Sequence, residues 1–177
     1  MTLRVRRLAP TDDRSQFASG NPDVDRFFQR FAGQNQFRHH IGVTYIAIAA
    51  EVIVGFVTVT ASEIEIDALP DERRRQLPRY PLPVLRVARL AVAEQAQGRG
   101  IGKALLRFAL DLARKTAEVV GCTGVVVDAK PAAQAFYLKY GFEPFALLEG
   151  GLLDRPEPTP LFLPLSAIPP LPPLRIR

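Results

Sequence analysis

The sequence has few residues that could bind a metal ion or form a disulfide. Cys122 is its only cysteine, so no disulfide can form within the chain, and a reducing compartment such as the cytoplasm is expected. The two histidines, His39 and His40, are adjacent and lack the spaced cysteine or carboxylate partners of a metal site. The composition therefore argues against a disulfide-stabilised protein and against metal chemistry, and no metal cofactor is expected.

Long apolar runs are also missing. No segment approaches the ~20 apolar residues that span a bilayer. Residues 1–7 carry charge without a following apolar core, so neither a membrane span nor a signal peptide is expected. With 47% hydrophobic and 23% charged residues, the 177-residue chain has the composition of one globular domain. We expect a cytoplasmic protein that does not bind membranes.

Positive charge is in excess, with a net charge of +5 and a pI of about 9.8. Arginines concentrate between residues 71 and 89, where Asp71 and Glu72 are the only acids. The arginines of this block are Arg73, Arg74, Arg75, Arg79, Arg86 and Arg89. Such a block is typical of a surface that binds a polyanion such as nucleic acid. Solvated surface groups and salt-bridge partners are the alternative interpretation.

The periodicity of apolar residues predicts a mixed α/β domain. Asn21 is a typical N-cap and Pro22 a typical first helical residue, so a helix is expected to begin there and to end soon after Gly33. Its apolar face is expected to hold Val24, Phe27, Phe28 and Phe31. Further helices are predicted over 100–118 and 132–140, and strands over 3–8, 43–49, 52–60, 84–92, 123–129, 142–147 and 161–165. The strands over 43–49 and 52–60 are expected to form a hairpin.

Prolines mark two segments of the chain. Those of residues 78–83 predict a stiff, extended connector before the strand over 84–92. Those of residues 168–174 predict a polyproline-like or flexible tail. We therefore predict one domain over residues 1–166 and a proline-rich, flexible tail over 167–177. A loose extension and a partner-recognition segment are both open roles for the tail.

A glycine-rich segment, Gln97-Gly98-Arg99-Gly100-Ile101-Gly102, leads from the strand over 84–92 into the helix over 100–118. Glycine lets the backbone turn tightly and approach a ligand closely. The free amides and the dipole at the start of the following helix then favour an anion. Arg99 and Lys103 flank this position and could neutralise phosphate charge. A tight turn into a packed helix would share the pattern.

Two common phosphate-binding patterns do not fit this segment. The Walker pattern ends in Gly-Lys-Ser/Thr, whereas Gly102-Lys103 is followed by Ala104, which has no hydroxyl for magnesium. The dinucleotide-binding fingerprint requires a third glycine where this sequence has Lys103. A P-loop and a Rossmann site are therefore excluded.

Three motifs in order resemble the GNAT acetyltransferase superfamily. They are Gln97-x-x-Gly100-x-Gly102, the strand Val125–Ala129, and Ala135-Phe136-Tyr137-x-x-x-Gly141-Phe142. The resemblance covers about residues 3–166. It implies an α/β fold whose mixed, mostly antiparallel central sheet is flanked by helices and splayed where acetyl-CoA binds.

The resemblance also implies a cofactor site for acetyl-CoA. The pantetheine arm would pair with backbone groups of residues 90–92, and the pyrophosphate would bind the amides of residues 97–103. The residues expected at the cofactor are Leu90, Ala91, Val92, Gln97, Gly98, Arg99, Gly100, Ile101, Gly102, Lys103, Asp128 and Phe136.

Tyr137 matches the tyrosine that donates a proton to the departing thiolate in many family members. A phenol with a pKa of ~10 is protonated at neutral pH and can protonate a thiolate whose pKa is near 8.5. Tyr137 is therefore expected to be the catalytic acid and Tyr140 to be structural. No general base stands out, which favours an α-amine acceptor, because an α-amine titrates near pH 8 whereas a lysine amine titrates at ~10.4.

Further motifs resemble the GNAT toxins of bacterial toxin–antitoxin systems. They are Phe17-x-x-Gly20, Asp25-x-Phe27-Phe28, Leu77-Pro78-Arg79-Tyr80-Pro81 and Arg89-Leu90-Ala91-Val92. This resemblance implies acetylation of the α-amine of an aminoacyl-tRNA, a homodimer, and a small ribbon-helix-helix antitoxin as partner. The residues expected to bind tRNA are Arg73, Arg74, Arg75, Arg79 and Arg89. The sequence departs from the pattern at Ser19, where a cysteine is usual, and in its proline-rich C-terminus.

Two alternatives stay open on the sequence. One is a GNAT enzyme that acetylates a small-molecule amine or a protein N-terminus. The other is a catalytically silent acetyl-CoA-binding module that acts through protein contacts.

Overall fold

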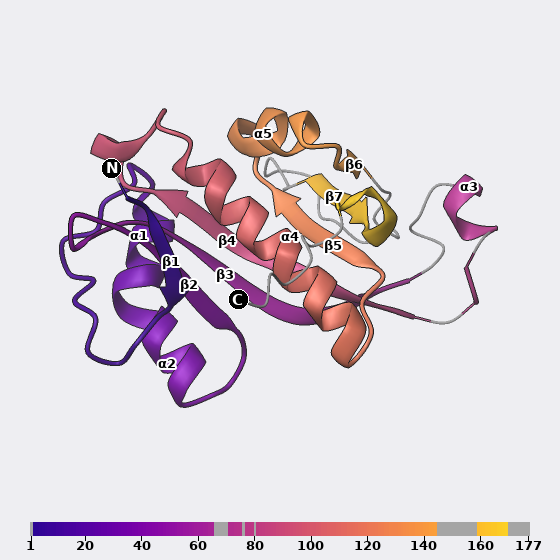
Figure 1. The fold of residues 1–177 in the computed structure, drawn as a ribbon, viewed down its shortest axis with the longest axis horizontal. Coiled ribbons are helices and arrows are strands. Elements are labelled where there is room, and N and C mark those ends of the chain that lie inside the picture. Colours follow the sequence, from indigo (N-terminus) through magenta and orange to yellow (C-terminus); the bar gives the residue numbers. More distant parts are fainter. Residues whose placement is uncertain (1, 66–70, 76, 80, 145–158, 170–177) are drawn as a thin grey trace, which may run out of the picture. The chain divides into compact units, whose positions relative to one another are not determined.

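The structure is a computed structural model that describes residues 2–65, 71–75, 77–79, 81–144 and 159–169. Seven strands of these residues form one sheet in the order β1-β2-β3-β4-β5-β7-β6 (Figure 1). The strands are β1 (Arg4–Arg7), β2 (Val43–Ala49), β3 (Val52–Ile64), β4 (Leu82–Val92), β5 (Gly124–Ala129), β6 (Glu143–Pro144) and β7 (Thr159–Pro164). The pairs β1–β2, β2–β3, β5–β7 and β6–β7 are antiparallel. The predicted α/β class and mostly antiparallel sheet are confirmed.

The helical elements follow the predicted order, with short additional turns. They are α1 (Pro22–Arg26), the π-helical η1 (Phe27–Phe31), α2 (Ala32–Phe37), α3 (Asp71–Arg74), η3 (Glu94–Ala96), α4 (Ile101–Val119), η4 (Pro131–Ala133), α5 (Gln134–Lys139) and η5 (Leu165–Ala167). The chain divides into two compact units, which we call unit 1 (residues 1–60 and 87–109) and unit 2 (residues 61–86 and 110–177). Each unit is described by itself.

The predicted hairpin of unit 1 is confirmed, and its turn has two residues. Ala50 and Glu51 have φ angles of 48° and 61°. Positive φ at both central positions is the conformation whose twist matches two paired strands. The partner strand β3 continues to Ile64, beyond the predicted end at residue 60.

The first helix begins as predicted, and the Asn21 side chain accepts hydrogen bonds from the amides of Asp23 and Val24. It was expected to end soon after Gly33, and its last segment, α2, ends at Phe37. The glycine has a packing role: a Cβ there would lie 3.0–3.3 Å from the guanidinium of Arg14.

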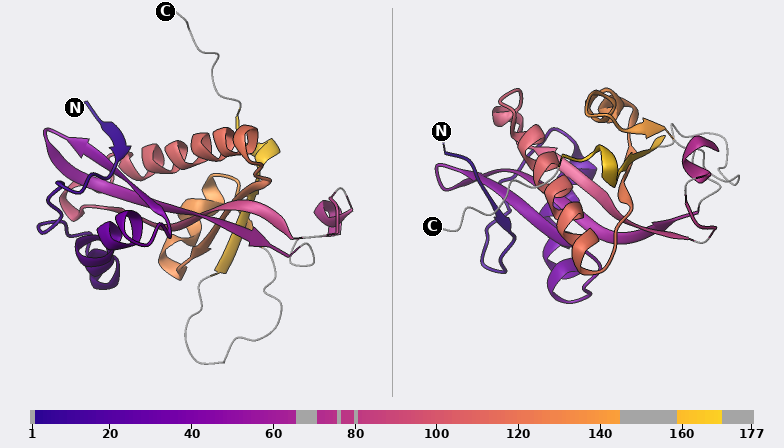
Figure 2. Two further views of the ribbon diagram at one scale, coloured as in Figure 1. Left: turned by 90° about the horizontal axis from the view of Figure 1, so that it is seen from below. Right: turned by 45° about the vertical axis from the view of Figure 1, so that its right-hand side comes forward.

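Aromatic rings fix this helical segment to the strands of unit 1. Phe28 stacks on Phe56 with ring centroids 4.2 Å apart, and Phe17 meets Phe28 edge-on at 4.9 Å. Phe31 was expected on the same apolar face but is 46% exposed. It is the last residue of η1, whose π turn is wider than the α-helical turn on which that expectation relied. The segment over 22–37 and the first half of α4 cover opposite faces of these strands (Figure 2).

Gln36 joins α2 to two strand ends. Its side chain is 2% exposed; the amide donates to the Leu8 carbonyl at 3.1 Å, and its oxygen accepts from the Thr44 amide at 2.8 Å. Both side-chain groups of a buried polar residue are thus paired with backbone. The bridge positions α2 against the start of β2.

Unit 2 has its own apolar core. This core comprises Ile64, Leu82, Val84, Val126 and Phe162. β5 and β7 pair from Gly124–Pro164 to Ala129–Thr159. A Cβ at Gly124 would overlap the Leu163 carbonyl oxygen, so only glycine fits at this close approach.

Three predictions concern residues near the ends of the described ranges. β4 begins at Leu82 rather than at residue 84, so that Pro83 lies within the strand, where its carbonyl accepts from the Thr123 amide at 2.8 Å. The strand predicted over 142–147 is described only as β6, and its last three residues lie outside the described ones. The domain boundary at residue 166 stays a prediction; Ile168 is 1% exposed and its carbonyl accepts from Arg114, while residues 170–177 lie outside the described ones.

Within the described ranges, no helix has the length and apolar character needed to cross a membrane. The same residues contain no group of three or more His, Cys, Asp or Glu side chains placed to hold a metal ion.

Replacing Gln36 with leucine is expected to lower the free energy of unfolding by about 1–3 kcal/mol, because the Leu8 carbonyl and the Thr44 amide lose a buried partner. Gln34→Leu, on the exposed side of the same helix, is the matched control and should change it by less than about 0.5 kcal/mol. Urea unfolding at neutral pH measures both. Equal losses in the two variants would contradict the buried bridge.

Candidate functional site

The glycine-rich segment has the open backbone that its sequence predicts. Gly98 and Gly100 have φ angles of 75° and 81°, in the left-handed region that favours glycine. Among the described residues other than its two chain neighbours, none has an atom within 4 Å of the position that a Cβ would occupy at either glycine. The surface of this turn is therefore free for a ligand to approach the backbone closely.

The amides that follow the turn begin a long helix. The Ala104 amide donates to the Gly100 carbonyl at 3.1 Å, so the amides of residues 101–103 precede the first such bond of α4. Orphan amides at a helix start, together with the helix dipole, form an anion site. Arg99 and Lys103 are exposed beside it, whereas the Ile101 side chain is buried, which leaves only its backbone for a ligand.

Gln97 holds the turn in place. Its side-chain amide donates to the carbonyls of Ser19 at 2.9 Å and Val92 at 3.1 Å, and its backbone amide donates to Glu94. The Ser19 hydroxyl donates in turn to the Asp25 carboxylate at 2.6 Å. Because its donors are used inside the protein, Gln97 shapes the turn, and the amides after it are the ones that can meet a phosphate.

The residues expected to pair with pantetheine lie in the same unit as the turn. Leu90, Ala91 and Val92 are half-buried at the end of β4, next to Ala88 and Arg89, which are exposed. A Cβ at Gly55 would lie 3.0 Å from the Ala91 carbonyl oxygen, so glycine permits β3 to approach here. Within unit 1, the structure thus brings the two expected parts of the cofactor site together as one continuous stretch.

Tyr137 belongs to unit 2, where it lies in α5 and is 5% exposed. Its ring meets those of Phe136 and Phe142 edge-on, with centroids 5.1 Å and 5.5 Å apart. Burial raises the pKa of the Tyr137 phenol to about 12, so the hydroxyl keeps its proton throughout the physiological range. The ring of Tyr140 packs against Phe136 at 5.2 Å.

Asp128, expected at the cofactor, is engaged by another side chain. It lies in β5 of unit 2 and accepts a hydrogen bond from Arg86 at 2.5 Å. Its carboxylate is 46% exposed, so the pair lies at the surface. A role at the cofactor stays a prediction.

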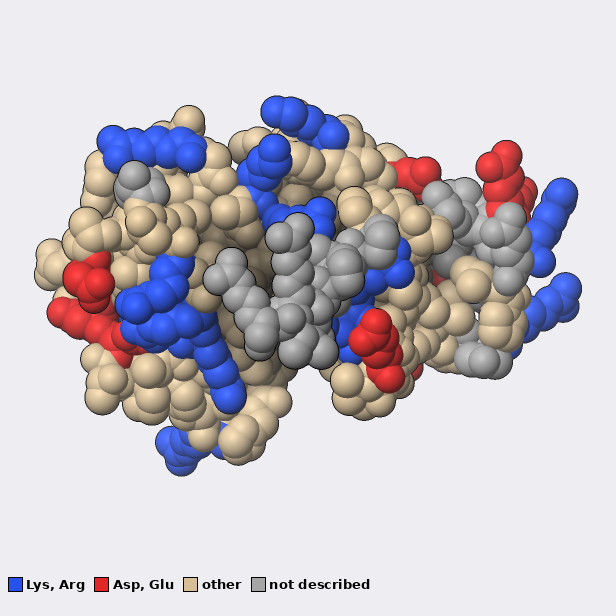
Figure 3. All heavy atoms as spheres, in the orientation of Figure 1, with Lys and Arg blue, Asp and Glu red and all other residues tan. Residues whose placement is uncertain are grey.

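The arginines expected to bind tRNA are divided between the two units. Arg75 and Arg79 of unit 2 are exposed, and Arg74 pairs with Asp71 in α3. Arg73 lies in the same helix. Figure 3 shows Lys and Arg side chains exposed at several places on the face that it draws.

Arg89 of unit 1 has a different setting from the other arginines. Its guanidinium carbon lies 3.8 Å from the centroid of the Phe27 ring, which is cation–π geometry. The partial burial of the guanidinium lowers the pKa of Arg89. Arginine remains charged in proteins, so this positive charge is fixed over an aromatic face.

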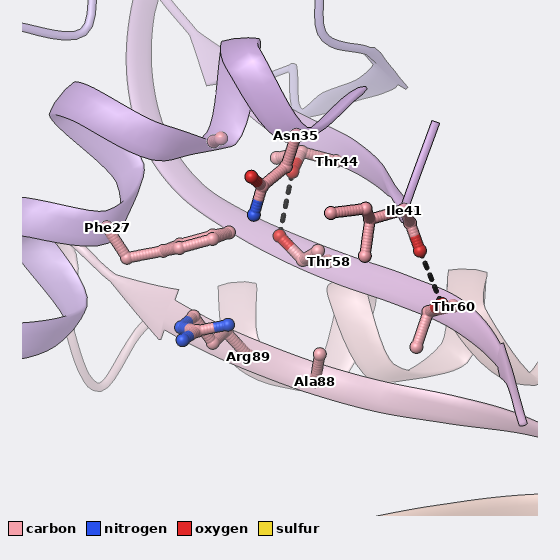
Figure 4. A pocket seen from close by; sticks show the side chains of 10 residues that line it. Phe27, Asn35, Ile41, Thr44, Thr58, Thr60, Ala88 and Arg89 are labelled. Carbon is pink, nitrogen blue, oxygen red and sulfur yellow. Dashed lines mark hydrogen bonds between the residues drawn. The ribbon is translucent and has the colours of Figure 1, made fainter. Parts of the chain in front are cut away.

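A pocket that the sequence motifs do not define surrounds this arginine (Figure 4). It has a volume of about 70 Å³. Its walls come from the helical segment at Phe27 and Asn35, the stretch from Ile41 into the start of β2, the middle of β3, and residues 88–89 of β4. Phe27 and Arg89 occur in motifs noted in the sequence, but nothing in the sequence joined them to the threonines of β2 and β3. Thr44 and Thr58 are buried and hydrogen-bonded to each other at 2.7 Å.

Comparison with protein families identifies the acetyltransferase (GNAT) domain, whose model matches residues 40–144. Among curated proteins, the chain is similar to the tRNA-acetylating toxin of Mycobacterium tuberculosis. The two are 32% identical over 139 residues, which cover 78% of this chain and 82% of the relative.

Two solved structures extend the likeness over nearly the whole chain. A structure of AtaT complexed with acetyl-methionyl-tRNAfMet is 25% identical and has a TM-score of 0.82, covering 94% of this chain and 97% of that one. A structure of AtaTR bound with AcCoA is 26% identical and has a TM-score of 0.74, with coverage of 94% and 95%.

The raised pKa of Tyr137 predicts a loss of stability in alkali. The folded state holds the phenol proton to about pH 12, whereas the unfolded state releases it near pH 10. The contribution of Tyr137 to the free energy of unfolding is therefore fully present below pH 10 and is lost as the pH rises toward 12. The loss is about 1.4 kcal/mol at pH 11.

The measurement is the free energy of urea unfolding between pH 8 and pH 11 for the wild type, Tyr137→Phe and Tyr140→Phe. The difference in free energy of unfolding between wild type and Tyr137→Phe should change by about 1.4 kcal/mol between pH 8 and pH 11. Tyr140→Phe, which retains Tyr137, should follow the wild type. A constant difference between wild type and Tyr137→Phe would show that Tyr137 is not buried as described.

Proposed function

This chain belongs to the GNAT acetyltransferase family, and we propose that it transfers the acetyl group of acetyl-CoA to the α-amine of an aminoacyl-tRNA. The observation that carries the acceptor is the likeness, over most of both chains, to a tRNA-acetylating toxin. Modification of the amine would prevent the aminoacyl group from being used in peptide-bond formation. The proposed role is therefore that of a toxin that blocks translation.

The residues of unit 1 fit acetyl-CoA at its phosphate end. The open surface over Gly98 and Gly100 admits the pyrophosphate, and the amides of residues 101–103 would donate to it. Arg99 and Lys103 supply the countercharge. The half-buried residues 90–92 would hold the pantetheine arm, which places the thioester toward the earlier residues of β4.

When bound, acetyl-CoA supplies the acetyl group as a thioester. The acceptor nitrogen forms a bond to the acetyl carbon, the carbon–sulfur bond breaks, the amine loses one proton, and the departing sulfur gains one. An α-amine titrates near pH 8, so a useful fraction of it is already neutral at pH 7. The acceptor therefore needs little help from a general base.

Tyr137 is the proposed donor of the proton to the sulfur. Its pKa of about 12 is higher than the ordinary value of ~10 on which the sequence argument relied, and also higher than that of a thiol at ~8.5. The phenol is consequently a weak acid that stays protonated throughout the physiological pH range. It would release this proton only as negative charge develops on the sulfur, so that proton transfer accompanies carbon–sulfur cleavage.

The experiment is to incubate the protein with acetyl-CoA and total charged tRNA and to detect N-acetylated aminoacyl ends. Tyr137→Phe is expected to reduce kcat by about 10²–10⁴-fold, because it removes the proton donor, and to leave acetyl-CoA binding within about twofold. Tyr140→Phe, three residues along the same segment, is the control and should retain most turnover.

The other outcomes separate the alternative functions. Transfer to small amines or protein N-termini, with no acetylated aminoacyl-tRNA, would reject the tRNA substrate but not the enzyme class. Cofactor binding without transfer to any amine would indicate a silent module. Wild-type activity in Tyr137→Phe would reject Tyr137 as the acid.

Exposed arginines of unit 2 are proposed to contact tRNA phosphates. Such contacts make the binding constant depend on the salt concentration. Arg75→Gln combined with Arg79→Gln should weaken binding of all aminoacyl-tRNAs alike and reduce the slope of log K against log salt by about 1 for each phosphate that is no longer neutralised. Lys115→Gln, an exposed cation of α4, is the control. An unchanged slope in the double variant would place these arginines outside the tRNA site.

A homodimer, a ribbon-helix-helix antitoxin and a cytoplasmic location are part of the same proposal, and they rest on the family resemblance. Sedimentation of the purified chain reports the dimer. Co-expression with a neighbouring small gene reports the antitoxin.

A further inference from the structure

The pocket around Arg89 includes Ala88 and Arg89, which directly precede the residues expected to hold the pantetheine arm. We propose that it receives the side chain of the amino acid carried by the tRNA, and that Arg89 makes it reject positively charged side chains. This inference rests on the proposed function, and it adds a residue that selects among acceptors.

The order of residues along β4 gives the position of the pocket. The cradle over 97–103 would hold the phosphates, and the pantetheine arm would then run back along residues 92 to 90. The next residues in this direction are Arg89 and Ala88, and both line the pocket. At about 3.3 Å per residue, the pocket begins within one or two residues of the expected end of the arm. The thioester and the accepting amine are therefore expected at its mouth.

The walls of the pocket are mostly apolar, and most of their polar groups are already paired. The hydroxyls of Thr44 and Thr58 bond to each other, and the Thr60 hydroxyl donates to the Ile41 carbonyl at 2.6 Å. Phe27 and the Ile41 side chain supply apolar surface. A volume of about 70 Å³ is more than a single water molecule needs. The space thus suits a small group with a largely apolar surface.

Asn35 provides an uncharged polar group that can bind a ligand in the pocket. Its side-chain amide points into the pocket between the threonines and Phe27 (Figure 4). No hydrogen bond to this amide is found within the part of the chain that the structure describes. It can therefore hydrogen-bond to an uncharged polar atom of a bound side chain.

Arg89 gives the pocket a positive charge. The guanidinium is held over the Phe27 ring, and none of the pocket-lining residues is acidic. A lysyl or arginyl side chain would bring a second positive charge beside it without a compensating carboxylate. Like charges placed together repel each other, and solvent reduces the repulsion at a site that stays accessible to water, so a discrimination of about tenfold is expected.

The π turn of η1 supports a functional role for this wall. Phe27 is the first residue of that turn, and single π turns within helices occur frequently at functional sites. The turn interrupts a helix that otherwise runs from Pro22 to Phe37.

The test compares two acceptors that differ by one charged group. A single tRNA, the one best acetylated by the wild type, is charged either with lysine or with norleucine, whose side chain has the same four carbons without the ammonium. The measured quantity is the ratio of kcat/KM for the two acceptors. Because it is taken within each variant, this ratio is unaffected by a general loss of activity.

The wild type is expected to prefer the norleucyl acceptor by about tenfold. Arg89→Met, which keeps an unbranched side chain but removes the charge, should bring the ratio near one, and Arg89→Glu should favour the lysyl acceptor. Phe27→Leu, which removes the ring that holds the guanidinium, should give an intermediate ratio. Arg79→Gln is the matched control: it should reduce kcat/KM for both acceptors and leave the ratio unchanged.

A wild-type ratio near one, or a ratio that stays the same in the Arg89 variants, would overturn the proposed selection while leaving the proposed function intact. Equal changes of the ratio in Arg79→Gln and Arg89→Met would assign it to general electrostatics and overturn the role of the pocket. Failure to acetylate any charged tRNA would reject the proposed function itself, and the inference with it.

Discussion

The side-chain amide of Gln97 donates to two carbonyls, one at the end of β4 and one at Ser19, and the candidate cofactor site depends on this bridge. It fixes where the chain leaves the strand, and so where the first amides of α4 point. The glycines that follow provide only conformational freedom, which would not by itself define a binding surface. A side chain that touches no ligand thus determines the geometry of the backbone that does.

The parts of the structure that the sequence predicts are those whose causes are local. The Asn21 cap, the two-residue hairpin turn and the glycine-rich entry to α4 each depend on residues only a few positions apart. The packing role of Gly33 was not predicted, because its packing partner is Arg14, nineteen positions away in sequence. The pocket was not predicted for the same reason, since its walls come from four separate segments of the chain.

Burial changes what some of the predicted residues can do. The sequence indicates a tyrosine at position 137 but not that aromatic packing makes it a weaker acid than a free phenol. It indicates a block of arginines but not that Arg86 pairs with Asp128 or that Arg89 belongs to the other unit. Residue identity therefore predicts the kind of chemistry, while the surroundings of each residue set its strength and its availability.

The stacking of Arg89 on Phe27 has an electrostatic consequence that a salt bridge would not have. A carboxylate partner would hold the guanidinium in place but would also cancel most of its field at a distance. An aromatic ring orients the same group through its quadrupole and contributes no net charge. The guanidinium is thus held in place while its full positive charge still acts on a group that enters the pocket. The charge of a bound metal ion acts in the same way in a metal site.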